Sequence, residues 1–591
     1  MAIPTVSDDE RRRYREAGWW GDRTLAQVIG QHARRHPEGP AYIVVGAGPG
    51  GTDRTLTWAD YDRQSSQLAA VLVAAGLEPG DRLGVVLPDG AAVHVAFVAA
   101  EKAGLVVAGI GARAGDAEVR HLLAHTGARA VVTHDTLRDR PAAAVVAALR
   151  GSTAGNGETV APDLLHVEIP PWPDDPASPV GGASPAGGTS PVSGTSPARG
   201  TSGARIDGRP VADPPVAETE RLLAGRAVGP DDLFMLNSTS GTTGLPKCVM
   251  HAQNRWFYFH QLVVDAAEMV PGDVFFGAVP APFGFGLWTA HFTPALLGSP
   301  TVVMERFEVG RALRAMARHE VTVLACVSTQ FIMMLNAPEL ETVDLTALRA
   351  MFTGGEAVPY DRAAAFEERT GAAVLQVYGS NESGAFSRST LRDSRERRLT
   401  TTGRVIEEMA VRVFDDDGRD VTGPVRVGVP GGRGPATCLG YYADDAANAQ
   451  LFTDDGWLLM GDIVEIDEDG YLKVVGRTSD IIIRGGKNIS APAVEAELAE
   501  HPAVAHVAVV AMPDDVFGER VCAYVVPRPG TTVTLGALVG FLADRGITRE
   551  WFPEGLVVVD DLPTSSGAKV AKGDLRQDVR ARLAAGTVLR A

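Results

Sequence analysis

The sequence predicts an α/β protein with more than one domain. Its 591 residues exceed the length that one hydrophobic core usually serves, so two or more domains are expected. Helical patterns alternate with short apolar runs over residues 24–150 and again over 273–380, as is typical of parallel sheets flanked by helices. Hydrophobic residues at 45% and charged residues at 22% fit a globular chain.

The first α/β region predicts helices in TLAQVIGQHARRHP and ADYDRQSSQLAAVLVAAGL, and strands in RLGVVLP and ARAVVTH. The composition changes near residue 170, where a loosely repeated G-T-S-P-like unit offers almost nothing that could pack. We therefore predict a disordered insertion at about residues 171–215. It lies within a domain, because sheet-like patterning resumes at DDLFMLNSTS.

Strand patterns continue with TVVMERF, VTVLACVST, ALRAMFTGG and AAVLQVYGS. Between residues 400 and 476 the apolar runs become shorter and alternate with polar residues, which predicts antiparallel strands and a small barrel. A fresh α/β pattern after Arg477, in which VEAELAEHP and TLGALVGFLADRG are the helices and VAHVAVVAMP and RVCAYVVP the strands, predicts a carboxy-terminal domain of about 110 residues.

Charge and composition exclude several classes of function. The formal net charge of −18 argues against a general nucleic-acid binder, which needs a basic face. Four scattered cysteines with no C-x-x-C pair fit neither a disulfide framework nor a structural zinc site, and favour a reducing cytoplasm. The charged amino terminus and the lack of about 18 uninterrupted apolar residues predict neither secretion nor membrane insertion.

The segment LNSTSGTTGLPKCVMH, residues 236–251, has the composition of a polyphosphate-binding loop. Glycines allow close approach of backbone N–H groups, hydroxyls donate hydrogen bonds to oxyanions, and lysine adds a point charge. Leu245 and Pro246 separate Gly244 from Lys247, so the segment is not a Walker A motif. On composition alone, a surface loop rich in Ser, Thr and Gly remains the alternative.

Four further segments give this loop a context: FTGGEAVP (352–359), QVYGSNESG (376–384), GWLLMGDIVEIDEDGYLKVVGRTSDIIIRGGKN (456–488) and LPTSSGAKVAKGDLR (562–576). Together with the loop they resemble the adenylate-forming superfamily of acyl-CoA synthetases, aryl-acid ligases, peptide-synthetase adenylation domains and firefly luciferase. The resemblance covers nearly the whole chain outside the insertion. It implies an adenylation domain over 1–477, with two doubly wound α/β subdomains and a small β-barrel, and a smaller, mobile α+β domain over 478–591.

The resemblance implies ATP and Mg²⁺ as ligands. Tyr378 would lie against adenine, Asp462 would accept hydrogen bonds from the ribose hydroxyls, and Glu382 would be the metal ligand. Lys247 would neutralise the departing pyrophosphate. The implied ATP-binding residues are Thr239, Ser240, Gly241, Thr242, Thr243, Gly244, Gly354, Gly355, Glu356, Tyr378, Gly379, Asn381, Asp462 and Arg477.

Lys569 is implied as the catalytic lysine between the carboxylate and the α-phosphate, with Lys572 as the alternative. The chain departs from the family pattern at several positions. These departures favour, as one alternative, a catalytically silent nucleotide-binding homologue. They are Cys248, Asn381, Met460, Ser479 and Ala568.

The resemblance also implies a second step, transfer of the acyl group to a thiol after rotation about a hinge at Ser479. Coenzyme A would lie against Arg484, Gly485, Gly486 and Lys487, although the two basic residues could equally be solvated surface charges. Amino-acid-activating relatives have aspartate where this chain has Gly284, so a non-amino acid is favoured. The acyl pocket is expected from Phe283, Gly284, Phe285, Trp288 and Phe331, whose aromatics could also be plain core.

The expected function is that of an ATP-dependent carboxylic acid:CoA ligase acting on a cyclic, aromatic or medium-chain acid. A stand-alone ligase that loads the pantetheine of an acyl carrier protein is the first alternative. The expected partners are a small carboxylic acid and coenzyme A or a carrier protein, without nucleic acid or membrane insertion. A cytoplasmic monomer or homodimer is expected, and the sequence does not identify the acid.

Overall fold

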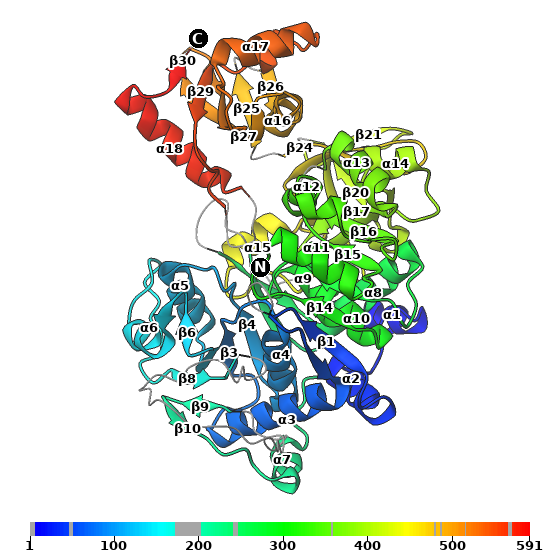
Figure 1. Ribbon diagram of the computed structural model, residues 1–591, viewed down its shortest axis with the longest axis vertical. Coiled ribbons are helices and arrows are strands. Elements are labelled where there is room, and N and C mark those ends of the chain that lie inside the picture. The colour runs from blue at the N-terminus through cyan, green and yellow to red at the C-terminus, as the bar shows by residue number, and fades with distance from the viewer. Residues whose placement is uncertain are drawn as a thin grey trace, which may run out of the picture.

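The computed structural model describes residues 6–46, 51–171, 203–239, 246–355, 358–415, 417–477, 480–484, 487–514, 516–564 and 570–590. Two large sheets and their helices form the main body, and a small antiparallel sheet lies against one side of it. The carboxy-terminal domain, orange to red in Figure 1, projects from this body beyond strand β24 (Leu472–Arg477).

The first large sheet has nine strands in the order β19-β18-β17-β16-β15-β13-β14-β1-β2. The strands from β17 to β1 run parallel, and antiparallel strands complete both edges. The strands are β1 (Pro40–Val44), β2 (Arg54–Thr57), β13 (Phe275–Gly277), β14 (Thr301–Val303), β15 (Val323–Ala325), β16 (Ala350–Gly354), β17 (Ala373–Ser380), β18 (Gly384–Arg388) and β19 (Arg404–Val405).

The second large sheet has eight strands in the order β10-β9-β8-β5-β3-β4-β11-β12. Strands β8, β5, β3, β4 and β11 are parallel, and β12 and β9 run antiparallel to their neighbours. The strands are β3 (Arg82–Val85), β4 (Val106–Gly109), β5 (Ala130–Thr133), β8 (Leu165–Glu168), β9 (Arg205–Ile206), β10 (Arg209–Pro210), β11 (Met235–Ser238) and β12 (Cys248–His251), with a separate hairpin of β6 (Thr136–Leu137) and β7 (Arg140–Pro141).

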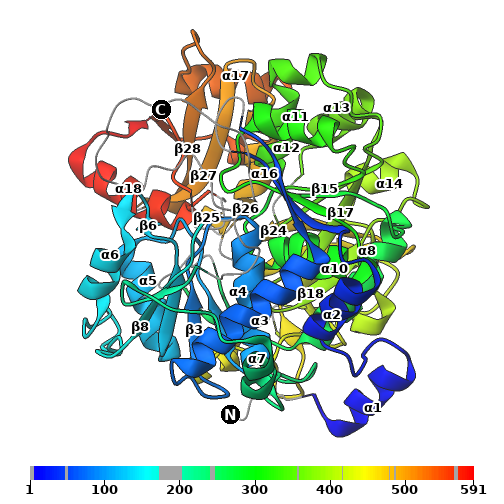
Figure 2. The same ribbon diagram turned by 60° about the horizontal axis from the view of Figure 1, so that its bottom comes forward.

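Helices cover both faces of each sheet, which explains the near-continuous apolar runs of the strands. Alternate residues of β13 show the principle, because Phe275 packs in the core between the sheets and Phe276 in the outer core. Figure 2 shows α3 and α4 running between β3 and β17, with α5 and α6 outside one sheet and α11 to α13 outside the other. The helices are α2 (Leu25–Arg35), α3 (Trp58–Ala74), α4 (Ala91–Ala103), α5 (Asp116–Thr126), α6 (Ala142–Leu149), α8 (Gln253–Ala267), α11 (Val309–Arg318), α12 (Ser328–Leu335) and α13 (Tyr360–Thr370).

The predicted helices begin where capping residues stand. The Thr24 hydroxyl accepts from the Gln27 N–H, and Oε1 of Gln27 accepts from the Thr24 N–H, which closes a capping box on α2. Thr57 caps α3 by accepting from the N–H of Asp60.

The element order and the sheet topology confirm the predicted α/β class and the elements quoted from residues 24–150 and 273–380.

The predicted insertion is wrong at its carboxyl end. Residues 205–210 form the hairpin β9–β10, which continues the second sheet through the pairing of Val167 with Ile206. Ala204 is buried against the core, and the main-chain N–H of Asp207 donates to the carbonyl oxygen of His166 at 2.9 Å. Residues 172–202, the rest of the predicted insertion, lie outside the described part of the chain.

The small sheet is antiparallel, as predicted, with β22 (Leu458–Leu459) added to the order β20-β21-β23-β24. This order begins at β20 and ends at β24, so the described pairings form an open sheet where a small barrel is expected. The other elements are α1 (Asp8–Glu16), α7 (Val216–Leu223), the helical run α9 (Gly284–Gly286), η1 (Leu287–Phe292) and α10 (Thr293–Leu297), η2 (Pro338–Glu341), α14 (Arg395–Thr400), η3 (Glu407–Met409), β20 (Arg412–Phe414), β21 (Arg426–Gly432), α15 (Asp445–Leu451) and β23 (Asp462–Ile466).

The carboxy-terminal domain has its own sheet, in the order β26-β25-β28-β29-β30 with β27 paired to β28. Two separate apolar clusters pack on this sheet, one with α16 and α17 and the other with α18. The elements are β25 (Ile481–Arg484), β26 (Lys487–Ser490), α16 (Ala491–Ala499), β27 (Val504–Asp514), β28 (Gly518–Pro527), α17 (Leu535–Asp544), η5 (Arg549–Trp551), β29 (Gly555–Val558), α18 (Lys572–Ala585) and β30 (Leu589–Arg590).

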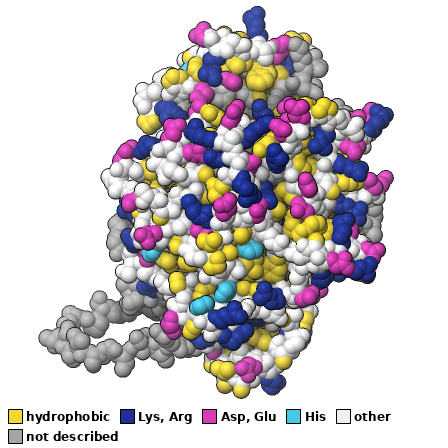
Figure 3. Space-filling model, turned by 90° about the vertical axis from the view of Figure 1, so that its right-hand side faces the viewer, with side chains coloured by type: hydrophobic (Ala, Val, Ile, Leu, Met, Phe, Trp, Pro, Cys, Tyr) yellow, Lys and Arg dark blue, Asp and Glu magenta, His cyan; other side chains and the backbone are white. Residues whose placement is uncertain are grey.

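Acidic and basic side chains are mixed over the face of the molecule shown in Figure 3. Among the described residues, many acidic and basic side chains pair; Arg397 of α14 pairs with Asp467 at 2.6 Å, and Arg392 with Asp265 at 2.8 Å. Within the described residues, none of the helices combines the length and the hydropathy that crossing a bilayer requires.

Candidate functional site

Several predicted site residues of the main body directly follow the carboxyl ends of strands. Thr239 follows β11, Gly355 follows β16, and Asn381 and Glu382 follow β17. Strands β13, β15, β16 and β17 are parallel, so the segments after them meet at one edge of the first sheet. In open α/β sheets, ligands bind in the crevice outside this edge.

The base of the predicted phosphate loop is closed by hydrogen bonds. The Thr239 N–H donates to the carbonyl oxygen of Lys247 at 2.9 Å, and the Lys247 N–H donates to the Thr239 hydroxyl at 3.1 Å. His121 of α5 contacts the carbonyl oxygen of Pro246 at 3.0 Å. The structure therefore fixes both ends of the loop, while Ser240, Gly241, Thr242, Thr243 and Gly244 lie outside the described residues.

Cys248 is a core residue in this structure. Its side chain is buried in the cluster between β12 and α5, and burial raises the pKa of its thiol to about 12. A thiol with that pKa stays protonated at neutral pH and is a poor nucleophile. The departure from the family pattern at Cys248 thus places a buried, unreactive thiol in the core.

Glu382 and Lys247, predicted as metal ligand and phosphate cation, contact the same residue. The Tyr441 hydroxyl donates to Oε1 of Glu382 at 2.8 Å. The Lys247 Nζ lies 4.8 Å from the centroid of the Tyr441 ring. The structure therefore brings together two residues that are 135 positions apart in the chain, through a third residue that the motifs did not single out.

The two residues predicted to hold adenosine are also joined. The Tyr378 hydroxyl donates to Oδ2 of Asp462 at 2.9 Å, and both side chains are buried. Arg477 lies directly opposite Asp462 in the β23–β24 pairing, although its side chain is outside the described set. A buried carboxylate needs hydrogen-bond donors, and the Tyr378 hydroxyl is one of them.

The predicted backbone lining has no space for side chains. A Cβ on Gly354 would lie 2.3 Å from the carbonyl oxygen of Val377, and a Cβ on Gly379 would lie 1.7 Å from that of Gly384. Gly355 has a φ of +78°, in the left-handed region that favours glycine. Glu356 lies outside the described residues. These glycines therefore have a packing reason whether or not a nucleotide lies beside them.

The predicted acyl motif contacts the segment that carries Glu382. The Gly284 N–H donates to Oδ1 of Asn381 at 3.0 Å. Phe285 packs edge-on to Trp288 at 5.4 Å between ring centroids, and Trp288 packs edge-on to Phe352 of β16 at 5.1 Å. The indole Nε1 of Trp288 is buried without a hydrogen-bond partner among the described residues, and Phe283 is buried nearby.

Phe331 is not part of this aromatic group. It lies on α12 in the outer core of the first sheet, where its ring is 5.8 Å from that of Phe366 on α13. Trp288 and Phe352 belong to the core on the other side of that sheet. The alternative stated for Phe331, plain core, fits its surroundings, and the prediction of a shared pocket does not.

The predicted coenzyme A contact Arg484 is already paired. Its guanidinium donates twice to Glu554, at 2.7 and 2.9 Å, and lies 4.4 Å from the ring centroid of Phe517. The Glu554 hydrogen bonds raise the pKa of Arg484, and its positive charge is compensated. Gly485, Gly486 and the side chain of Lys487 lie outside the described residues, as does Ser479.

The two candidate catalytic lysines differ in what the structure says of them. The Lys572 ammonium pairs with Glu495 at 2.8 Å and with Asp480 at 3.3 Å, inside the carboxy-terminal domain. Its charge is therefore used to hold α18 against β25 and α16. Lys569 lies outside the described residues, so its catalytic role stays a prediction.

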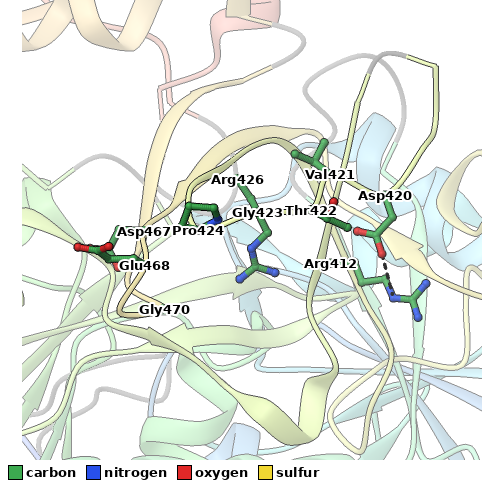
Figure 4. Close-up of a pocket in the computed structure, with 10 residues that line it drawn as sticks. All are labelled: Arg412, Asp420, Val421, Thr422, Gly423, Pro424, Arg426, Asp467, Glu468 and Gly470. Carbon is green, nitrogen blue, oxygen red and sulfur yellow. Dashed lines mark ion pairs between the residues drawn. The ribbon is translucent and has the colours of Figure 1, made fainter.

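A shallow hollow of about 350 Å³ lies elsewhere, on the small antiparallel sheet (Figure 4). None of its lining residues belongs to the predicted site, and three of its charged residues form ion pairs. Arg412 pairs with Asp420 at 3.6 Å, and Asp467 pairs with Arg397. The functional candidate therefore remains the edge of the first sheet.

Tyr441 is the member of this arrangement that the sequence motifs did not reveal. It follows no strand motif, and its partners precede it by 59 and 194 positions, so no local periodicity connects them. Segment 378–382 is the centre of the arrangement, because Tyr378 contacts Asp462, Asn381 contacts Gly284, and Glu382 contacts Tyr441.

Comparison with known proteins finds two family models that match the chain. Residues 29–442 match the family model described as AMP-binding enzyme, and residues 493–569 match that of the AMP-binding enzyme C-terminal domain. The medium-chain fatty-acid–CoA ligase of Escherichia coli is 29% identical over 582 residues, 98% of this chain and 94% of that protein. The salicyl-AMP ligase/salicyl-S-ArCP synthetase of Mycobacterium tuberculosis is 31% identical over 95% of this chain and 92% of its own.

Solved structures extend the likeness to the whole fold. ATP-bound MatB from Rhodopseudomonas palustris superposes with a TM-score of 0.72 at 25% identity, covering 94% of this chain and 98% of that one. The predicted arrangement of mixed α/β sheets with a separate carboxy-terminal domain is thus confirmed.

Proposed function

Because the chain belongs to the AMP-binding enzyme family, we propose that it is an ATP-dependent ligase that joins a non-amino carboxylic acid to coenzyme A. In the first step a carboxylate oxygen attacks the α-phosphorus of ATP, and the bond to pyrophosphate breaks to leave an acyl-AMP. In the second step the thiol sulfur of coenzyme A attacks the acyl carbon, AMP leaves, and the thiol proton passes to solvent. A carboxylate is already a nucleophile, so the first step needs no protein base.

The observation that carries this proposal is the set of contacts made by residues 378–382. At one end of the segment, the Tyr378 hydroxyl donates to Asp462, the carboxylate predicted to bind ribose. At the other end, Glu382 accepts from the Tyr441 hydroxyl, and Lys247 lies over the Tyr441 ring. In this proposal one nucleotide lies along the segment, with adenosine at Tyr378 and phosphates toward Glu382. Asn381 stands between these ends, where the α-phosphate and the acyl carboxylate would meet.

The donor set fits Mg²⁺. The Tyr441 hydroxyl occupies Oε1 of Glu382, and the second carboxylate oxygen is a hard ligand of the kind that Mg²⁺ takes together with phosphate oxygens. Bound there, Mg²⁺ would supply neutralisation of phosphate charge. Lys247 would add a second positive charge beside the leaving pyrophosphate, and Lys569 would stabilise the charge that develops between carboxylate and α-phosphate.

The substrate class follows from the environment of Gly284. An α-ammonium group would need a carboxylate at this position, and a buried unpaired charge is costly. Gly284 has no side chain and its N–H is used by Asn381, while the neighbouring rings of Phe285 and Trp288 are apolar. We therefore propose an aromatic, cyclic or medium-chain acid, in keeping with relatives that are named for fatty and aryl acids.

A carrier protein is the second candidate for the acyl acceptor. A relative that matches 95% of this chain is named as a salicyl-S-ArCP synthetase. In addition, Arg484 is paired with Glu554 and offers little free charge to the phosphates of coenzyme A. A carrier-bound pantetheine presents fewer phosphates than free coenzyme A, so it would depend less on such a charge.

Purified protein incubated with ATP, Mg²⁺ and a panel of acids tests the proposal. Acid-dependent exchange of labelled pyrophosphate into ATP is the expected result for the first step, and acyl-CoA formation on addition of coenzyme A is expected for the second. Exchange without thioester would transfer the acceptor role to a carrier protein. Silence across the panel, despite ATP binding, would contradict the enzymatic proposal and favour the silent homologue.

A further inference from the structure

The main chain of Tyr441 is held by two hydrogen bonds to one buried side chain. Its N–H donates to Oδ1 of Asn448 at 2.7 Å, and its carbonyl oxygen accepts from Nδ2 of the same side chain at 2.8 Å. Asn448 is buried on α15, whose amino end is capped by Asp444. Both backbone groups of Tyr441 are thus fixed by one buried amide.

The segment around Tyr441 also ties two predicted parts of the site to each other. Tyr441 pairs with Val249 of β12 in an isolated bridge, and the N–H of Met250 donates to the carbonyl oxygen of Gly440 at 2.8 Å. Three residues earlier, the N–H of Cys438 donates to the main-chain oxygen of Glu382 at 2.8 Å. The exit strand of the phosphate loop and the turn that carries Glu382 therefore share one support.

The side chain of Tyr441 offers two different surfaces. Its hydroxyl donates to Oε1 of Glu382 at 2.8 Å, and the ring is buried. The face of its ring carries negative potential, which attracts the Lys247 ammonium 4.8 Å from the centroid. A carboxylate is bound at the edge of the ring and a cation over its face.

This division matters because Lys247 and Glu382 carry opposite charges. If the two side chains met directly they would form an ion pair, and each would lose the free charge that a phosphate or a metal ion needs. With the phenol between them, the carboxylate keeps its second oxygen for a cation and the ammonium keeps its donors for phosphate oxygens.

We propose that Tyr441 is a positioning residue that holds Glu382 and Lys247 apart and oriented, so that one side chain sets both the metal-binding and the phosphate-binding charge of the site. The inference rests on the proposed function, because it takes Glu382 as the metal ligand and Lys247 as the phosphate cation. Tyr441 itself touches neither the acid nor the phosphates in this scheme.

Another tyrosine provides a matched control. The Tyr471 hydroxyl donates to Asp393 at 2.6 Å, and Arg397 and Arg404 lie 4.4 and 4.9 Å from its ring centroid. Tyr471 therefore makes the same two kinds of contact, a carboxylate at its edge and cations over its face, at a place where no site is predicted. Its substitution should reproduce any loss of stability without the effect on the ligand.

The test compares binding of ATP with and without metal, by titration calorimetry of the full chain in Mg²⁺ and in EDTA. Tyr441→Phe keeps the ring and removes the hydroxyl, so it should raise the Kd of Mg·ATP about tenfold and change the Kd of metal-free ATP by less than about twofold. Tyr441→Leu should also raise the Kd of metal-free ATP, about fivefold, because Lys247 loses its support. Tyr471→Phe should leave both constants within about twofold of wild type.

A second background keeps the outcome decisive if a variant is unstable. In Glu382→Gln protein, the further change Tyr441→Phe should alter the Kd of Mg·ATP by less than about twofold, since the metal ligand is already gone. Equal weakening of both ligand forms by Tyr441→Phe, or no weakening at all, would overturn the inference. Failure of the proposed function would look different: the wild-type protein would bind ATP with no acid-dependent pyrophosphate exchange.

Discussion

Asn381 illustrates how a single side chain can connect two functions. A backbone N–H can only donate, so the hydrogen bond from Gly284 requires the carbonyl oxygen of the Asn381 amide. The NH₂ group must then point the other way, with two donors for an anionic oxygen. Asn381 departs from the pattern of the family that the chain resembles, but its amide can still donate to an anionic oxygen while it links this segment to the acyl motif.

We predict that Gly284→Ala impairs the first reaction step more than it impairs folding. The new methyl group would lie 2.4 Å from Oδ1 of Asn381 and 3.3 Å from the Trp256 ring, so the amide must move. Acid-dependent pyrophosphate exchange should fall about tenfold or more in kcat/KM. Adding Asn381→Thr, a smaller side chain, should recover part of that loss.

Gly540→Ala serves as the control, because a Cβ at this position of α17 meets nothing within 4 Å. Alanine favours helix over glycine, so this variant should be slightly stabilised and fully active. If Gly284→Ala and Gly540→Ala were equally active, the contact between the acyl motif and Asn381 would have no role in substrate activation.

Asp89, at the turn after β3, is predicted to give the stability a pH dependence. Its Oδ1 accepts from the N–H of Ala281 at 2.8 Å, and burial raises the pKa of the carboxyl from 3.8 to about 6. A raised acid pKa contributes stability that is present below pH 3.8 and is lost as the pH rises through 6. Asp89→Asn keeps the hydrogen-bond acceptor without the charge. At pH 8 its free energy of unfolding should therefore exceed that of the wild type by on the order of 1 kcal/mol.

Urea titrations of both proteins at pH 5 and pH 8 measure this difference. The stability advantage of Asp89→Asn should be larger at pH 8 than at pH 5, since wild-type Asp89 is mostly neutral at the lower pH. An advantage that is equal at the two values would mean that the charge of Asp89 has no part in it.

At the scale of elements, hydrophobic periodicity predicted the strands and helices that have buried faces. The apolar runs of β13 to β17 and the helices α2 and α3 were predictable because both faces of each strand and one face of each helix are buried. The hairpin β9–β10 was not, since its strands have two residues each and its sequence, RIDGRP, has no apolar alternation. It is stabilised by pairing with β8, a partner that local sequence does not identify.

The corrected insertion boundary makes a prediction about deletions. A Cβ on Gly203 would lie 2.9 Å from Pro170, so the residues flanking segment 172–202 are neighbours and a short Gly-Ser join can connect them. Deleting residues 172–202 should leave the melting temperature within a few degrees of wild type. Deleting residues 172–215 removes β9 and β10 as well and should lower it clearly.

The contrast between the two deletions is the measurement, by thermal melting followed with circular dichroism. A large loss on removal of 172–202 alone would mean that this segment, despite its composition, contributes to the packed structure. Equal tolerance of both deletions would show that the edge hairpin adds little to the second sheet.

At the scale of the whole molecule, the sequence motifs predicted the residues of the site, but only the structure shows which of their side chains contact one another. Tyr378, Asn381 and Glu382 were predicted from one segment, and the structure gives each a different distant partner. Phe331 was predicted to line the acyl pocket because the local sequence does not show which face of α12 is buried in the outer core. Arg484 was predicted to bind coenzyme A because its partner Glu554 is 70 positions away in the chain. Local sequence patterns do not identify contacts between residues that are far apart in the chain.

The two lysines of the last motif should separate the two reaction steps. Lys569→Ala should lower acid-dependent pyrophosphate exchange by orders of magnitude, because it removes positive charge where carboxylate and α-phosphate meet. Formation of acyl-CoA from supplied acyl-AMP should change only a few-fold, since that step involves no phosphoryl attack. Lys572→Ala instead leaves Glu495 and Asp480 without their shared cation, so it should destabilise the carboxy-terminal domain by ~3 kcal/mol and lower both steps together.

Both activities and a melting curve, measured for each variant, distinguish these outcomes. A Lys569→Ala protein of normal stability that loses the two steps equally would contradict the assignment of Lys569 to adenylation. A Lys572→Ala protein that is stable and loses only pyrophosphate exchange would transfer the catalytic role to Lys572. That result would also require its ammonium to leave Glu495 and Asp480 during the reaction, because a cation held 2.8 Å from one carboxylate and 3.3 Å from another is not free to stabilise a third.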